Sequence, residues 1–147
     1  MLDKIIAFFM AAYLFFAGIP YGNEPIKVEF EYEIPSQVTI YEPGDHVYIV
    51  ITVTNVGRPF IGKKLFHHSV DEYVYQVIDG KKVGLSSWHY ITADEPKPAI
   101  IKHGYTNDVV CTFQIADDAV PGIYSLQVSC GGCSQVFENV LEVKAKD

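Results

Sequence analysis

Two cysteines separated by two glycines, Cys130 and Cys133, stand near the carboxyl end of the chain. A C-x-x-C pair supports redox chemistry when its first cysteine begins a helix, because the helix dipole lowers the thiol pKa. Here the flanking residues alternate as strands do, and Gly131-Gly132 fits a two-residue hairpin loop that requires positive φ angles. A structural zinc ion would need two further ligands, and the sequence has no second C-x-x-C. The motif therefore predicts a turn with structural rather than catalytic cysteines.

A third cysteine, Cys111, opens a choice of disulfides. We expect Cys111 and Cys130 to face the interior from opposing sheets, at the same end of the fold. A bridge between them would close a loop of about twenty residues and stabilise the fold by ~3 kcal/mol through loop entropy. A Cys130–Cys133 bridge is also within reach, because opposed residues at a hydrogen-bonded position lie ~5.5 Å apart at Cα. We favour a bridge from Cys111 to one member of the pair, and the sequence leaves the pairing open.

The stretch H-H-S-V-D-E, residues 67–72, brings two histidines and two acids together and invites a metal interpretation. Adjacent residues of a strand point to opposite faces, so His67 and His68 could bind one ion only from a loop. Solvated loop residues are the simpler interpretation, and we expect no metal and no cofactor. Both histidines are kept as candidates for a partner-binding surface.

Trp88 and Tyr90 share one face of a predicted strand, and His89 points to the other. Aromatic residues on a strand usually belong to the core. If they are exposed, they would form a stacking or protein-binding surface. Trp88 and Tyr90 therefore join His67 and His68 as the candidate binding residues.

Composition and motifs disfavour two classes of function. The formal charge is −7, and the only paired bases are Lys63-Lys64 and Lys81-Lys82, so the clustered positive field that nucleic acid requires is missing. The sequence contains no G-x-S-x-G, no H-E-x-x-H and no cysteine beside a plausible histidine. We therefore expect a protein that is not an enzyme and does not bind nucleic acid.

The amino terminus differs from the rest of the chain. After M-L-D-K come fifteen residues without a charge, I-I-A-F-F-M-A-A-Y-L-F-F-A-G-I. This length fits the apolar region of a signal peptide and falls short of the ~18–20 residues of a membrane span. We predict a signal peptide or an uncleaved membrane anchor over residues 1–22. The remaining domain, residues 23–147, would then be secreted or extracytoplasmic, where disulfides persist.

Beyond residue 22 the apolar residues alternate with polar ones at a period of two, which is the pattern of half-buried strands. Turn residues separate the strands, including E-P-G-D at 42–45 and Asp79-Gly80. No helical periodicity follows residue 22. The sequence therefore predicts an all-β protein, an antiparallel sandwich of about seven strands.

The residues of these strands resemble bacterial immunoglobulin-like domains. P-G-D-H-V-Y-I-V-I-T-V-T-N-V-G is similar to their second strand, and V-I-D-G-K-K-V-G resembles the middle hairpin of cell-adhesion-related (CARDB-type) modules. F-Q-I-A-D-D-A-V-P-G-I-Y-S-L-Q-V resembles their final crossover, and the likeness covers about residues 26–144. The resemblance implies a non-catalytic binding or accessory module. Such a module would meet a protein or a cell-surface glycan through edge strands or through loops such as 58–70 and 92–107.

A looser resemblance is to the intracellular (BsuPI-like) proteinase inhibitor domain, which is also a small immunoglobulin-like sandwich. The matching features are the hairpin from Asp79 to Val83, Trp88, and the step from Pro121 to Tyr124. The chain departs from that family in its predicted export signal, and no inhibitory loop can be matched. This resemblance implies proteinase inhibition as the alternative function.

Overall fold

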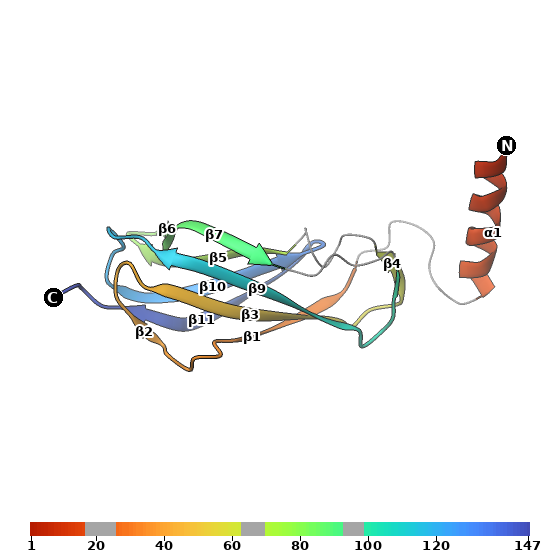
Figure 1. Cartoon of the computed structure of the whole chain (residues 1–147). Coiled ribbons are helices and arrows are strands. Elements are labelled where there is room, and N and C mark those ends of the chain that lie inside the picture. Colours follow the sequence, from red (N-terminus) through yellow and green to blue (C-terminus); the bar gives the residue numbers. More distant parts are fainter. Residues whose placement is uncertain (17–25, 63–69, 93–98) are drawn as a thin grey trace.

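The computed structural model describes residues 1–16, 26–62, 70–92 and 99–147 (Figure 1). Within these ranges lie one helix and eleven strands. They are α1 (Leu2–Phe16), β1 (Val28–Glu33), β2 (Ile40–Tyr41), β3 (His46–Asn55), β4 (Phe60–Gly62), β5 (Asp71–Ile78), β6 (Lys81–Gly84), β7 (Ser86–Thr92), β8 (Ala99–Ile101), β9 (Thr106–Ile115), β10 (Gly122–Cys130) and β11 (Cys133–Val143). Among the described residues, no helix is both long enough and apolar enough to cross a membrane.

Nine of the strands form two sheets that face each other. The first sheet has the order β1-β3-β9-β7, and the second has the order β2-β11-β10-β5-β6. β4 and β8 form a separate antiparallel pair. Every pairing within the two sheets is antiparallel except that of β2 with β11, which is parallel. The predicted all-β, immunoglobulin-like antiparallel sandwich is confirmed, with more strands than the seven expected.

The core lies between the sheets and follows the alternation of the sequence. In β3 every second residue is buried, because successive side chains of a strand point to opposite faces. β9 and β10 repeat the pattern from the two sheets. Burying each such valine, leucine or isoleucine stabilises the fold by roughly 1.5–3 kcal/mol. The fully buried side chains include Val47, Ile49, Ile51, Val53, Val109, Ile115, Tyr124, Leu126, Val128, Leu141 and Val143.

One segment passes from one sheet to the other between β6 and β7. Lys81–Gly84 pairs in the second sheet, whereas Ser86–Thr92 pairs in the first. Leu85 lies between them and is fully buried. Its amide N–H donates to Val74 O at 2.9 Å, and its carbonyl accepts from Ala116 N–H at 3.2 Å. These two hydrogen bonds connect the crossover at Leu85 to both sheets.

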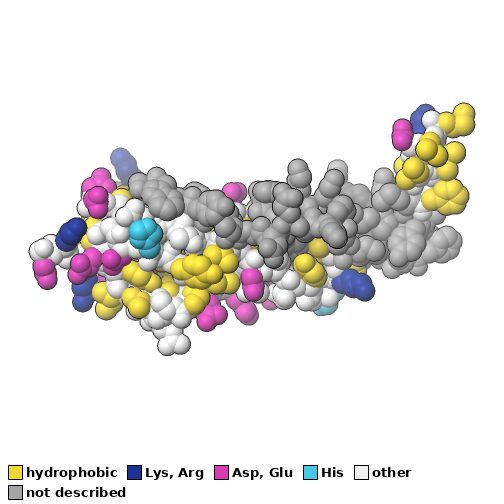
Figure 2. All heavy atoms as spheres, in the orientation of Figure 1, with side chains coloured by type: hydrophobic (Ala, Val, Ile, Leu, Met, Phe, Trp, Pro, Cys, Tyr) yellow, Lys and Arg dark blue, Asp and Glu magenta, His cyan; other side chains and the backbone are white. Residues whose placement is uncertain are grey.

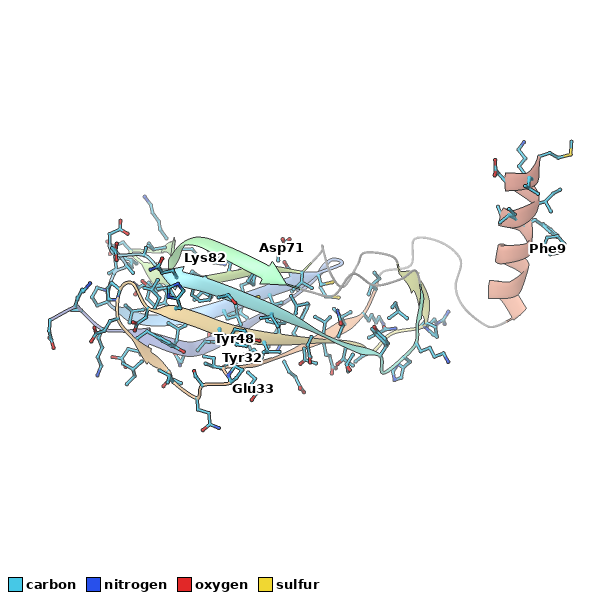
Figure 3. All side chains as sticks on the ribbon, viewed as in Figure 1. Phe9, Tyr32, Glu33, Tyr48, Asp71 and Lys82 are labelled. Atoms are coloured by element: carbon cyan, nitrogen blue, oxygen red, sulfur yellow. The ribbon has the colours of Figure 1, made fainter. Side chains whose placement is uncertain are left out.

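The chain enters the sandwich at one end and leaves it at the other. β1 begins near β4, whereas the carboxyl terminus lies at the opposite end (Figure 1). We call these the β4 end and the C-terminal end. Between them, Tyr32 of β1 packs against Phe137 of β11, with ring centroids 4.9 Å apart (Tyr32 is labelled in Figure 3). This contact joins the two sheets along their β1–β11 side.

Candidate binding surfaces

The outer face of the first sheet presents an exposed aromatic residue, Tyr48 of β3. Its side chain is 46% exposed, and Figure 2 shows hydrophobic side chains gathered over the middle of β3 on this face. Val50 and Val110 beside it are half-buried. Next along the strands, the Thr52 hydroxyl donates to Asp108 Oδ1 at 2.7 Å. The face therefore combines an apolar centre with polar neighbours.

Two of the predicted binding residues belong to β7, at the edge of this sheet. Trp88 pairs with Gln114 of β9, and Tyr90 pairs with Thr112, which also pairs with Tyr48. The structure does not describe the side chains of Trp88 and Tyr90, so their role in a binding surface stays a prediction.

The remaining predicted binding residues, His67 and His68, lie in residues 63–69, outside the described ranges. Parts of the two predicted partner loops, residues 63–69 and 93–98, also lie outside them. Their role stays a prediction.

The outer face of the second sheet carries a stack of three side chains. The rings of Tyr73 and Tyr75, both on β5, are 5.4 Å apart and inclined by only 15°. Lys82 of β6 places its ammonium Nζ 4.3 Å from the centre of the Tyr75 ring, a cation–π contact. Tyr75 is therefore nearly buried, at 7% exposure, although it points away from the core.

Polar side chains on the neighbouring strands extend this stack. Lys82 Nζ donates to Gln127 Oε1 at 2.7 Å, so the lysine reaches across Tyr75 to β10. Gln127 Nε2 in turn donates to Ser134 Oγ of β11 at 3.4 Å. Asp71 and Lys82, labelled in Figure 3, lie along the β5–β6 edge of the sandwich. Sequence reasoning missed this surface. A sequence pattern could have indicated it: two tyrosines stand at positions i and i+2 of a predicted strand. The D-G turn after that strand folds a lysine and a glycine back beside them.

The cysteine turn has the predicted form. Cys130 pairs with Cys133, and the intervening Gly131 and Gly132 have φ angles of 57° and 86°. All three cysteines belong to the described part of the chain, and no disulfide joins any of them there. The Cys133 thiol instead donates to Ile26 O at 3.1 Å, which ties the turn to the segment that precedes β1.

The expected relation between Cys111 and Cys130 holds only in part. They belong to opposing sheets as predicted. Cys111, however, lies in the middle of β9, whereas Cys130 ends β10, so the prediction that both lie at one end is wrong. Burial, and secondarily the carboxylate of Glu72, raises the pKa of Cys111.

The thiol of Cys130 is poorly suited to nucleophilic chemistry. Burial, followed by the neighbouring Cys133 and Asp71, raises the pKa of Cys130 to about 11. A raised pKa keeps the thiol protonated at neutral pH, and the thiolate is the reactive form. Across the described ranges, no three His, Cys, Asp or Glu side chains come together in a way that could hold a metal ion.

No family model and no curated protein matches this chain. Solved structures match its fold at low identity. A mutant β-glucosidase from Listeria innocua in complex with laminaribiose is 16% identical with a TM-score of 0.50, and the match covers 84% of this chain and 17% of that one. The sporulation control protein Spo0M of Bacillus subtilis is 15% identical with a TM-score of 0.46, covering 84% of this chain and 51% of that one. A family 123 glycoside hydrolase from Clostridium perfringens is 12% identical with a TM-score of 0.42, and the match covers 84% of this chain and 28% of that one. This chain thus spans about a sixth of the length of the glucosidase, and the likeness concerns the fold alone.

Proposed function

We propose that this chain is an exported, non-catalytic immunoglobulin-like module that binds a protein or a glycan through an outer sheet face. The observation that carries the proposal is the presence of an exposed tyrosine on each outer face, Tyr48 and Tyr73, with hydrogen-bonding side chains beside it. Tyrosine suits such surfaces, because its ring offers contact area at little cost in conformational entropy. The two packed sheets hold the backbone that carries both tyrosines.

Export is part of this proposal. α1 has 15 residues and is about 22 Å long at 1.5 Å per residue, shorter than the ~30 Å hydrocarbon core of a bilayer. Its length favours a signal peptide over residues 1–22 and leaves an uncleaved anchor as the alternative. Amino-terminal sequencing of the protein from culture medium and from membranes tests both. Full-length protein found only in the cytoplasm would contradict export.

An oxidising compartment would also permit a disulfide. We propose that Cys130 bridges to Cys133, since they are paired across the turn and Cys111 lies at a different level of the sandwich. This replaces our initial preference for a bridge that includes Cys111. Peptide mapping of the secreted protein without reduction would identify the pair, and a peptide linked through Cys111 would contradict it.

The binding function is tested with the immobilised full chain. Cell-wall glycan and surface-protein fractions are passed over the wild type, Tyr48→Ala and Tyr73→Ala, with circular dichroism to verify that each variant is folded. We expect the wild type to retain a partner from one fraction, and one of the two variants to lose it. Equal retention by all three chains would contradict binding through the outer faces.

Proteinase inhibition is the competing hypothesis, implied by the looser of the two resemblances. A panel of serine, cysteine and metalloproteases incubated with the full chain separates the two functions. We expect no inhibition. Nanomolar inhibition that is abolished by substitutions within residues 58–70 or 92–107 would overturn the proposal.

A further inference from the structure

The stack on the second sheet has a closed end and an open end. Lys82 places its ammonium group over the Tyr75 ring, and the Tyr73 ring stacks on Tyr75 as well. Tyr73 is the last member of the stack and remains 43% exposed, whereas Tyr75 is 7% exposed. Ring faces attract further flat or C–H-bearing groups. The stack can therefore accept one more member on Tyr73.

Hydrogen-bonding groups lie on the sheet next to this open end. Asp71, two residues before Tyr73 on β5, pairs with Ser129 of β10, which pairs with Ser134 of β11. The row supplies one carboxylate and two hydroxyls, and Asp71 and Ser134 are exposed. Gln127 stands opposite Tyr73 and is already held by Lys82 and Ser134. The surroundings of Tyr73 are therefore polar and ordered on the β10 side.

Glycine at position 84 fixes the Tyr73 ring on the other side. A Cβ atom at Gly84 would lie 3.2 Å from Tyr73 Cε2 and 3.3 Å from its hydroxyl oxygen. The ring thus rests directly on the backbone of β6, an edge strand, in a place that a side chain would fill. A ring fixed before binding loses less entropy when a ligand arrives.

We propose that Tyr73 and the row Asp71–Ser129–Ser134 form a subsite for a neutral glycan. A sugar ring has an apolar C–H face and a rim of hydroxyls, so one face stacks on Tyr73 while the rim exchanges hydrogen bonds with the carboxylate and the serines. The net charge of −7 and the Asp71 carboxylate disfavour an anionic glycan. An apolar protein segment would bury these polar groups without partners. The inference deepens the proposed binding function and rests on it.

The test titrates the folded full chain with two probes, the hexasaccharides of β-1,4-linked glucose and of β-1,4-linked N-acetylglucosamine, and measures affinity by NMR. Hexalysine serves as a third probe, because a cation could also stack on a tyrosine beside a carboxylate. We expect at least one hexasaccharide to bind and Tyr73→Ala to weaken it about tenfold, the equivalent of ~1.4 kcal/mol. Tyr73→Phe should bind nearly as well as the wild type.

Two further variants separate the subsite from general effects. Gly84→Ala keeps the tyrosine but displaces its ring, so we expect a weaker affinity than in the wild type. Ile40→Ala removes an apolar side chain of similar exposure, 48%, from β2 at the opposite edge of the same sheet and should leave the affinity unchanged. Circular dichroism and thermal unfolding confirm that each variant is folded.

Three outcomes would overturn the inference. They are no binding of either hexasaccharide, an equal loss of affinity in Ile40→Ala and Tyr73→Ala, and binding of hexalysine in place of the sugars. If the chain still retains a surface protein through Tyr48, the module function stands and only the glycan subsite is wrong.

Discussion

The two ends of the sandwich are closed by polar side chains in different ways. At the β4 end, the fully buried Asn55 donates through Nδ2 to the carbonyls of Arg58, Ile101 and Lys102 at 3.2–3.3 Å. Its Oδ1 accepts from Gly57 N–H at 3.0 Å. At the C-terminal end, the Tyr124 hydroxyl donates to Val120 O at 2.7 Å and accepts from Gln76 Nε2.

The two ends differ in whether water could replace the hydrogen bonds of the closing side chain. The Asn55 side chain has no access to solvent, and its hydrogen bond to the Ile101 carbonyl is buried, so water cannot take its place there. The Tyr124 ring is buried, but its hydroxyl and Gln76 reach the partly exposed rim of the sheet. The β4 end therefore depends on a single side chain, and the C-terminal end should tolerate substitution better.

The largest expected effect is at Asn55. Asn55→Ala should lower the free energy of unfolding by about 3 kcal/mol, because the buried Ile101 carbonyl loses the amide hydrogen bond. Asn55→Asp keeps the size but loses the donor, so it should destabilise more at pH 7 than at pH 4, where a protonated carboxyl donates again. Urea denaturation at both pH values measures this. A loss below 0.5 kcal/mol for Asn55→Ala would contradict the comparison.

The second prediction concerns alkaline pH under reducing conditions. The folded-state pKa of Cys130 is raised to about 11 from an ordinary 9.0, so its stabilisation is present below pH 9 and is lost as pH rises toward 11. Cys111, whose pKa is also raised, acts in the same direction. We expect a loss of roughly 2 kcal/mol by pH 11, measured by urea denaturation.

Tyr124 is the internal control for that prediction. Burial raises its pKa, so its ionisation also lowers stability, but only above pH 10. Between pH 9 and pH 10 the loss of stability should therefore be larger in Tyr124→Phe, which keeps both thiols, than in Cys130→Ala, which keeps only Cys111. Identical curves for both variants would show that the thiol is not responsible.

A smaller effect is expected for Tyr124→Phe at neutral pH. Removal of the hydroxyl leaves the ring packed and breaks its hydrogen bond to Val120 O, at a cost of about 1 kcal/mol. Tyr41→Phe is the matched control, because its hydroxyl also donates to a carbonyl a few residues earlier in the chain, Val38 O at 2.7 Å. Thermal unfolding compares them. A loss for Tyr124→Phe as large as that for Asn55→Ala would remove the difference between the ends.

The smallest effect is on reactivity rather than stability. Under native, reducing conditions a maleimide should modify the half-buried Cys133 first and the buried Cys111 last. Timed quenching and peptide mass spectrometry give the order. Modification of Cys111 before Cys133 would show that the interior opens more readily than the turn does.

The period of two predicted the strands and their buried faces, because it depends only on local backbone geometry. It could not assign strands to sheets, and so missed that the chain changes sheet at Leu85. The pairing register of the strands could not be predicted either, because it is set by the partner strands. For this reason the predicted position of Cys111 relative to Cys130 was wrong. Tyr75 shows the same limit for the candidate site. Alternation points it outward, but its burial comes from Tyr73 and from Lys82 of another strand.

The opposite positions of the first strand and the carboxyl terminus determine how the domain would present a fused segment. A ten-residue strand such as β3 extends about 33 Å, so the sandwich separates its entry point from its exit by roughly that distance. A tag fused to the carboxyl terminus would therefore stand at the opposite end of the sandwich from the first strand (Figure 1).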